Sequence, residues 1–187
     1  MPKIYTRYGD QGQTGLLYGG RVSKADLRCE AYGTTDEAIS ALGLARSLTS
    51  DQRVKEIILQ VQRELFTIGA ELATDPREYA TFLKHFQPTT PEMVTRLEQL
   101  IDQLTEEAPL PRSFIIPGAS PASAALDMAR STLRRAERRV VEVKEKGLLA
   151  NPEVLRYLNR LADMLFVLGR YQDRHLPLET LTGESKG

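Results

Sequence analysis

The stretch from residue 114 to 143 constrains the fold most strongly; it begins FIIPGASPASAALDMARSTLRRAERRV. From Leu126 to Val143, apolar residues recur at alternating steps of three and four. That spacing is typical of a helix with one face packed against other helices. Ser120 and Pro121 precede this pattern, and they are residue types that favour the N-cap and the first position of a helix. The stretch therefore predicts a long, packed helix that begins near Pro121.

The charges of this predicted helix gather along one edge. At about 100° per residue, four of them fall within an arc of roughly 100° beside the apolar face: Arg130, Arg134, Glu137 and Arg138. Arg135 points away from this arc. Neighbouring guanidiniums repel one another unless an anion lies among them, and the donor fork of arginine suits phosphate oxygens. The edge is therefore either an anion site or a solvated basic face in which Glu137 pairs internally.

The overall charge limits the kind of anion. The 187 residues are enough for one domain with a full core, and they contain 25 Lys and Arg against 25 Asp and Glu. Nucleic-acid-binding proteins usually carry a basic excess, so we expect no nucleic-acid partner. Because the positive charge is local, it favours a small anion over a polyanion.

Cys29 is the one cysteine, so the chain has no internal disulfide and no cysteine-based zinc site. We expect its side chain to fill part of the core. No apolar run approaches about 18 residues, and the N-terminus has no apolar signal region. We therefore predict a cytoplasmic protein with no membrane partner.

Four further segments have helical apolar spacing, and they predict helices over residues 30–48, 52–74, 91–107 and 151–174. With the arginine-bearing helix, they predict an all-α fold, a five-helix bundle over residues 29–174 of a single domain. Asn151 and Pro152 are expected to begin the last helix. The intervening residues 75–90 are interpreted as a mixed connection, and residues 175–187 as a frayed tail.

In the first of these helices, Gly33 and the Thr34-Thr35 pair predict a break or cap. Asp36 and Glu37 would then lie early in the helix, where its dipole favours carboxylates.

Residues 1–28 are polar and glycine-rich, and they predict an irregular segment rather than a helix. Glycine permits positive φ angles and close backbone approach, so successive N–H groups can converge on an anion. The segment matches neither a Walker loop nor a dinucleotide-binding fingerprint. We favour an ordered anion-binding loop over a flexible tail, because apolar residues such as Ile4, Leu16 and Leu17 have no purpose in a tail.

Three segments together resemble a known family: KIYTRYGDQGQTGLLYGGRVSK near the N-terminus, FIIPG with AALDMARSTLRRAERRV in the middle, and YLNRLADMLFVLGR near the C-terminus. They are similar to the propanediol-utilisation-type ATP:cob(I)alamin adenosyltransferases, from Lys3 to about Arg170. The resemblance implies a homotrimeric five-helix bundle with active sites between subunits. It also implies transfer of the adenosyl group of ATP to the cobalt of cob(I)alamin, with triphosphate as the other product.

The resemblance assigns the nucleotide site. It implies that Arg134 and Arg138 contact the phosphates of ATP with Lys24, and that Glu137 helps to hold Mg²⁺. Arg135 is also counted among the nucleotide-binding residues. The remaining residues expected to wrap or bond to the nucleotide are Thr6, Arg7, Tyr8, Gly9, Thr14, Gly15 and Asn159.

The resemblance also assigns the corrinoid side of the site. It implies that Phe114 blocks the vacated axial face of the cobalt, which makes reduction to Co(I) easier. Arg130 is expected to pair with Asp36 of the neighbouring subunit. The sequence departs from the family at Asp127, often a histidine, and at Ile39, often an asparagine. We expect Asp127 to pair with Arg130 or Arg134.

Two alternatives stay open. One is a non-catalytic ATP-binding or adenosylcobalamin-carrying protein on the same bundle, and the other is a helical interaction module with a basic face. The presence of both Phe114 and Arg134 favours the enzyme. As further partners, the resemblance implies a flavoprotein reductase and an adenosylcobalamin-dependent enzyme.

Overall fold

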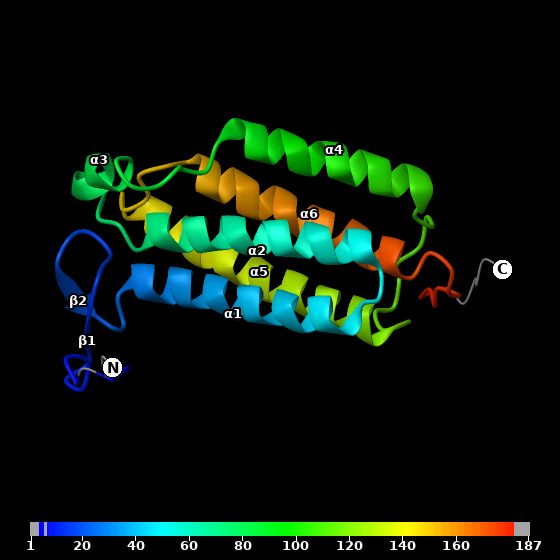
Figure 1. Cartoon of the computed structure of the whole chain (residues 1–187), viewed down its shortest axis with the longest axis horizontal. Helices are drawn as coiled ribbons and strands as arrows, with labels where there is room; N and C mark the ends of the chain where they lie inside the picture. The colour runs from blue at the N-terminus through cyan, green and yellow to red at the C-terminus, as the bar shows by residue number, and fades with distance from the viewer. Residues whose placement is uncertain (1–3, 6, 182–187) are drawn as a thin grey trace.

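The computed structural model describes residues 4–5 and 7–181, and this part of the chain is mainly helical (Figure 1). Its elements, in chain order, are β1 (Gln13–Gly15), β2 (Arg21–Ser23), α1 (Leu27–Leu48), α2 (Gln52–Leu72), a 3₁₀ turn (Pro76–Glu78), α3 (Tyr79–Phe82), α4 (Pro91–Glu107), α5 (Pro121–Glu145) and α6 (Glu153–Gln172). The all-helical class is confirmed. The described residues form six α-helices where five were predicted, because the 75–90 connection contains the short α3.

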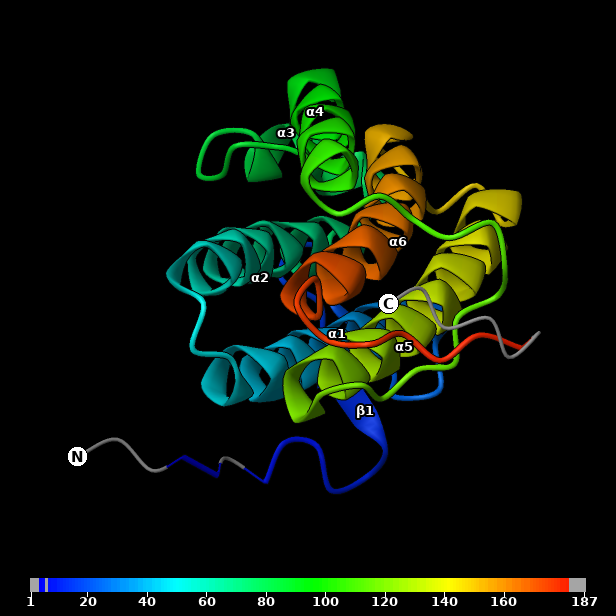
Figure 2. The ribbon, with the colours of Figure 1, turned by 90° about the vertical axis from the view of Figure 1, so that its right-hand side faces the viewer.

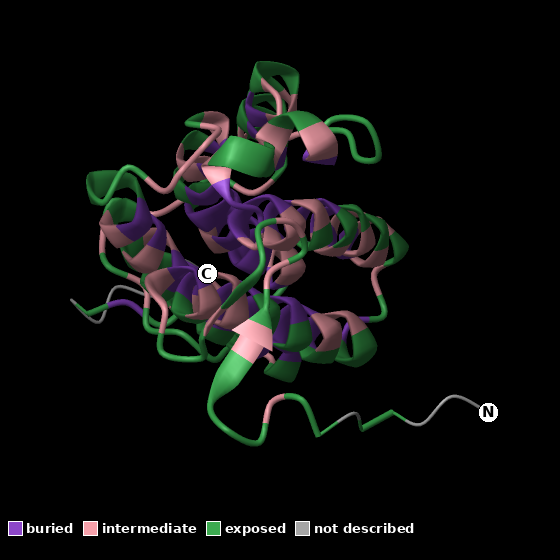
Figure 3. Ribbon diagram, turned by 90° about the vertical axis from the view of Figure 1, so that its left-hand side faces the viewer, coloured by how far each residue is buried: buried purple, intermediate pink, exposed green. Residues whose placement is uncertain are grey.

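The five long helices run lengthwise, and each reverses the direction of the long helix before it; α4 is reached from α2 through the α3 connection (Figure 1). α1 packs against α2 and α5, and α6 packs against α5 and α4. Seen end-on, α4 lies on the outside of α6, away from α1 (Figure 2). The core is built from the predicted apolar stripes, with Leu42, Leu65, Leu133 and Leu161 all fully buried. The face of each helix that points into the bundle is the buried one (Figure 3).

The beginning of α5 follows the prediction closely. Ser120 is its N-cap, Pro121 its first residue, and Ser123 completes a capping box by accepting from the Ser120 backbone N–H at 3.2 Å. The Ser120 hydroxyl in turn accepts from the Ser123 N–H. These bonds satisfy two of the backbone donors that a helix leaves open at its N-terminus.

The prediction for the first helix was wrong at its start. α1 begins at Leu27, three residues before the predicted Glu30, with Asp26 as its N-cap. The expected break is absent, because the hydroxyls of Thr34 and Thr35 donate to helix carbonyls four residues earlier. Asp36 and Glu37 therefore lie in the middle of the helix, and the dipole interpretation of their position does not hold.

The prediction of a frayed C-terminal tail was also wrong for the residues that the structure describes. Residues 179–181 run beside residues 114–116, with Ile115 and Thr180 forming an antiparallel bridge. The Ile116 N–H donates to the Glu179 carbonyl at 2.8 Å, and the Leu181 N–H donates to the Phe114 carbonyl at 2.9 Å. Thr180 is buried. The end of the described chain is thus paired with the segment before α5.

The last helix starts at Glu153, later than predicted, with Pro152 at the N-cap position. Asn151 still caps through its side chain, whose Oδ1 accepts from the Glu153 N–H at 3.1 Å. Its Nδ2 donates to the buried carboxylate of Glu71 at 2.8 Å and so joins α6 to α2. Within the described residues, no helix combines the length and the apolar character needed to cross a membrane.

Candidate functional site

The N-terminal segment is an ordered hairpin in its second half, where an irregular loop was predicted. β1 and β2 are antiparallel, with Thr14 opposite Val22 and Gly15 opposite Arg21. Arg21 reaches back along the chain, and its Nη2 donates to the Tyr8 carbonyl at 2.6 Å. This bond ties the residues before the hairpin to its second strand. Thr6, a predicted nucleotide contact, lies outside the described residues.

Lys24 follows β2 directly and lies against the preceding loop. Its backbone N–H donates to the Gly12 carbonyl at 2.8 Å. A Cβ placed on Gly9 would lie 3.0 Å from the Lys24 Nζ, so the amine lies directly against the backbone of Gly9. The structure therefore brings three of the predicted site residues, Gly9, Thr14 and Lys24, into one small unit.

Contacts through Cys29 and Tyr32 join the hairpin to α1. The Cys29 thiol donates to the Ser23 carbonyl at 3.6 Å, and the Tyr32 hydroxyl donates to the Cys29 Sγ at 3.1 Å. Burial, followed by this bond to the thiol, raises the pKa of Tyr32 to about 12. Cys29 is half-buried beside the hairpin, so the expectation that it fills the core was wrong.

The arginines of α5 divide into two groups. Three have acidic partners: Arg135 pairs with Glu37 of α1, Arg139 with Glu142 at 2.9 Å and Glu30 at 3.6 Å, and Arg130 with Asp127 at 3.3 Å.

The other two are Arg134 and Arg138, both exposed, and neither pairs with an acidic side chain among residues 4–5 and 7–181. They are two of the residues predicted to bind phosphate. Their positive charge is therefore uncompensated by the rest of the described chain. Arg135, also predicted to bind the nucleotide, faces α1, as its angular position on the helix indicated.

Glu137 shares a helix edge with the two unpaired arginines and contacts α6. Its Oε1 accepts from the Asn159 Nδ2 at 2.8 Å. The structure thus joins two predicted site residues from different helices. One carboxylate oxygen of Glu137 is left for another ligand. The described residues contain no group of three or more His, Cys, Asp or Glu side chains that would hold a metal ion by itself.

The hairpin and the C-terminal half of α5 lie at the same end of the bundle (Figure 1). The ion pair between Arg139 and Glu30 holds this part of α5 against the first turn of α1. Lys24 precedes that turn, and Arg138 precedes Arg139. Lys24 and Arg138 therefore lie toward the same end of the molecule, and Arg134 lies about one turn of α5 nearer its middle.

Phe114 lies in the segment that enters α5 at the other end. Its side chain is 82% exposed, so it is no part of this chain's core. The 13 residues from Pro121 to Arg134 span about 20 Å along α5 at 1.5 Å per residue. Within one chain, Phe114 and the predicted phosphate site therefore lie at different positions along the bundle.

Arg130 has a partner in its own chain, and Asp36 lies elsewhere. The carboxylate of Asp127 binds Arg130 at 3.3 Å and the buried Arg170 at 2.5 Å. The ring of Phe166 lies between the two guanidiniums, 5.8 Å from Arg130 and 5.4 Å from Arg170. The expectation that Asp127 pairs with Arg130 is confirmed. Asp36 is exposed on α1 and lines two open hollows, one toward α2 and one toward α5.

One cluster beside the hairpin was missed from the sequence. Asp75 is buried after α2, and guanidiniums of Arg28 and Arg77 bind its carboxylate. From sequence, the Asp75-Pro76 pair indicated only the end of a helix. The signal available was the residue type itself, since a buried aspartate needs charged or polar partners.

Comparison with known proteins gives a consistent result. The family model described as cobalamin adenosyltransferase matches residues 4–172. A corrinoid adenosyltransferase of Citrobacter freundii is 42% identical over 174 residues, which cover 92% of this chain and 96% of that protein. A corrinoid adenosyltransferase of Bacillus subtilis (strain 168) is 44% identical over 174 residues, covering 90% and 85%.

Solved structures agree with these relatives. A variant of the PduO-type ATP:corrinoid adenosyltransferase from Lactobacillus reuteri, complexed with cobalamin and ATP, superposes with a TM-score of 0.86. It is 34% identical, and the match covers 98% of both chains. A second variant of that enzyme, complexed with ATP, gives a TM-score of 0.85 at 33% identity, covering 95% of this chain and 99% of that one.

Proposed function

The chain belongs to the cobalamin adenosyltransferase family, and we propose that it transfers the 5′-deoxyadenosyl group of ATP to the Co(I) of cob(I)alamin. The observation that carries this proposal is that Arg134 and Arg138 have no acidic partner in the described chain and lie in the C-terminal half of α5, the half that ends beside the hairpin preceding Lys24 (Figure 1). Two guanidiniums and an ammonium that lack acidic partners in the described chain suit a polyphosphate.

The reaction needs strong stabilisation of its leaving group. Co(I) supplies an electron pair that forms the cobalt–carbon bond at C5′ of ATP. The bond between C5′ and the phosphate oxygen breaks, and triphosphate leaves with the bonding electrons. Negative charge grows on that oxygen as the bond breaks, so fixed cations aimed at the phosphates lower the barrier. This is the role we propose for Arg134 and Arg138, with Lys24 closing the other side.

The hairpin segment would hold the rest of the nucleotide. Arg7 has a positive φ of 63°, a conformation that turns the backbone sharply before Gly9. With the Arg21 contact to the Tyr8 carbonyl, this turn would shape the loop around ATP. We propose the same contacts for the loop and hairpin as the resemblance implies, from Thr6, Arg7, Tyr8, Gly9, Thr14 and Gly15, with Asn159 from α6.

Glu137 fits a magnesium ion bound together with ATP. Mg²⁺ is usually held by one or two carboxylates plus substrate phosphates and waters, rather than by a full protein cage. A single carboxylate on the same helix edge as two arginines proposed to bind phosphate is such a donor set. When bound, Mg²⁺ would neutralise part of the triphosphate charge. Asn159 would keep the Glu137 side chain in position through its 2.8 Å hydrogen bond.

Phe114 would act on the corrinoid. An apolar ring beside the cobalt excludes water and supplies no axial ligand, which favours the four-coordinate state that is reduced more easily. The 82% exposure of Phe114 in this chain is consistent with a ring that is available to a ligand.

We further propose a homotrimer with sites between subunits. A site made by one chain would need Phe114 and Arg134 close together, and the stretch of α5 that lies between them in sequence, from Pro121 to Arg134, alone spans about 20 Å. Exposed apolar side chains also surround Asp36, with Phe66 at 63%, Met128 at 51% and Leu44 at 47% exposure. Such a face is suited to another copy of the chain, whose Arg130 would then exchange Asp127 for Asp36.

The test mixes the protein with ATP, Mg²⁺ and chemically reduced cobalamin under anaerobic conditions and follows the cobalamin spectrum. We expect adenosylcobalamin and one equivalent of triphosphate. ATP and cobalamin binding without turnover would contradict the transferase and indicate the carrier protein instead. Analytical ultracentrifugation of the same sample tests the trimer separately, since a stable monomer with full activity would rule out shared sites.

A further inference from the structure

The turn of the hairpin is fastened to the connection that follows α2. The Leu17 N–H donates to the Ala73 carbonyl at 2.9 Å, and the Asp75 N–H donates to the Tyr18 carbonyl at 2.9 Å. Tyr18 and Thr74 form a parallel bridge between these two bonds. The segment that bears Thr14 and Lys24 is therefore held to the bundle at residues 73–75.

Gly19 allows Asp75 to come into van der Waals contact with the turn. Its φ is +121°, and a Cβ placed there would lie 2.4 Å from the Cβ of Asp75. Any side chain at residue 19 would push Asp75 away. Gly20, the next residue, also has a positive φ of +87°, but a Cβ there would meet nothing within 4 Å. The close packing against Asp75 is thus specific to Gly19.

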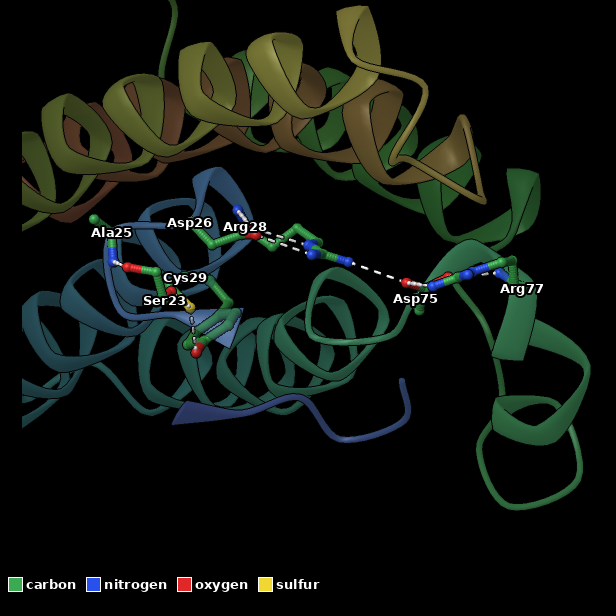
Figure 4. Close-up of polar contacts among 8 residues, drawn as sticks. Ser23, Ala25, Asp26, Arg28, Cys29, Asp75 and Arg77 are labelled. Atoms are coloured by element: carbon green, nitrogen blue, oxygen red, sulfur yellow. Dashed lines mark hydrogen bonds and ion pairs between the residues drawn. The ribbon is translucent and has the colours of Figure 1, made fainter. Parts of the chain in front are cut away.

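The carboxylate of Asp75 links this turn to two other segments (Figure 4). It accepts from Arg77 at 2.9 and 3.0 Å within the 3₁₀ turn, and from the Arg28 Nη1 at 3.4 Å. Arg28 also makes two 2.9 Å bonds to Asp26, the N-cap of α1. The side chains of Arg28 and Asp75 are 8% and 10% exposed, so water screens this pair weakly.

We propose that Asp75 is a positioning residue that sets the place of the hairpin against the first turn of α1. Gly19 and the backbone bonds fix the turn to residue 75, while Arg28 fixes residue 75 to α1. Since α1 pairs with α5 through Glu30 and Arg139, the link sets how far Lys24 lies from Arg134 and Arg138. The consequence for ATP rests on the proposed function, whereas the fastening of the hairpin does not.

The test compares Asp75→Asn with Asp51→Asn. Asp51 is a matched control outside this cluster, because it is also an N-cap carboxylate, accepts from a backbone N–H and pairs with an arginine, Arg174 at 2.9 Å. It lies at the N-terminus of α2, away from the hairpin. Asp75→Asn should speed amide exchange at Leu17 and residue 75 by about tenfold or more, the scale of one hydrogen bond to a charged group. Magnesium-ATP affinity, measured by calorimetry, should fall by a similar factor.

Asp51→Asn should leave both quantities unchanged, whatever its effect on melting temperature. Unchanged exchange in Asp75→Asn would overturn the fastening, and faster exchange with unchanged ATP affinity would overturn the link to the nucleotide. A second pair, Gly19→Ala against Gly20→Ala, repeats the comparison without changing charge, and equal effects of the two would also overturn the proposal. If the unchanged protein forms no adenosylcobalamin, the proposed function is wrong, but the role of Asp75 in fastening the hairpin is unaffected.

Discussion

Asn159 on α6 donates through its Nδ2 to the Oε1 of Glu137 on α5 at 2.8 Å, which holds the carboxylate on the helix edge that also carries Arg134 and Arg138. The three charged residues follow one another at steps of three and one along α5, on one edge of the helix. The bond fixes the orientation of one anionic group on this edge, although it forms no ion pair with either arginine. One Glu137 oxygen stays available for a cation that accompanies a polyphosphate.

Glu137→Gln should weaken binding of magnesium-ATP by about tenfold, because an amide oxygen is a poorer Mg²⁺ ligand than a carboxylate. The glutamine still accepts from Asn159, so the thermal midpoint should stay near that of the unchanged protein. Calorimetric titrations with ATP in the presence of Mg²⁺ and of EDTA check this. The matched control is Glu142→Gln, a glutamate of α5 that pairs with Arg139. An equal loss of affinity with and without Mg²⁺ would argue against the metal role.

Arg134→Ala should lower the rate of adenosyl transfer by about 10²–10³, the usual effect of removing one electrostatic stabiliser of a transition state. Its side chain is exposed and has no acidic partner within the described residues, so stability should change by less than about 0.5 kcal/mol. Steady-state kinetics followed through the cobalamin spectrum measure the loss. Arg63→Ala, at an exposed arginine of α2, serves as the control. Turnover of Arg134→Ala within a factor of two of the control would show that the residue has another role.

Asp127→Ala should destabilise the fold by about 3–5 kcal/mol, because it leaves the guanidinium of Arg170 buried without its partner. Arg170 already has two nitrogens, Nε and Nη1, that lack a hydrogen-bond partner in the described part of the chain. Urea denaturation gives the free energy of unfolding. Asp163→Ala removes a surface partner of Arg160 and should cost less than about 1 kcal/mol. Similar values for the two variants would mean that Asp127 contributes little to the core.

The free energy of unfolding should fall as the pH drops below about 4, the ordinary range of an aspartate. Hydrogen bonds from the Arg77 side chain hold the pKa of Asp75 well below that range, and those from Arg28 lower the pKa of Asp26. A lowered folded-state pKa adds stability above the unfolded value, and this stability is lost as the pH falls toward the folded value. Urea denaturation at a series of pH values between 2.5 and 7 gives the free energy of unfolding at each pH. This free energy should fall less steeply with decreasing pH in Asp75→Asn than in the unchanged protein. The same pH dependence in both proteins would mean that Asp75 has the same pKa in the folded and the unfolded state.

The helices were the part of the fold that the sequence predicted well. Each long helix buries one face, and that burial fixes a three- and four-residue spacing that is visible without the structure. Ser120 and Pro121 marked the start of α5 because capping is a local interaction. The start of α1 was missed since Gly33 and the two threonines suggested a break, and packing with back-bonded hydroxyls overrode that local preference.

The pairings between distant segments were not predictable in this way. The bridge between Ile115 and Thr180 joins residues 65 positions apart, and neither short segment has a pattern of its own. The cluster at Asp75 likewise depends on Arg28, which reaches it only after α1 and α2 have packed. The helical spacing of α5 was enough to predict that several of its arginines lie along one edge. It could not show which arginines of α5 have acidic partners, because Glu30 and Glu37 lie on another helix, α1.

The bridge of Thr180 to Ile115 means that the end of the described chain braces the backbone that carries Phe114. A fusion partner or a shortened C-terminus would therefore alter the position of the Phe114 ring. The hairpin, at the opposite end of the bundle, would not be affected. If Phe114 acts on the corrinoid as proposed, a change at the C-terminus would alter the corrinoid side of the site without altering the nucleotide side.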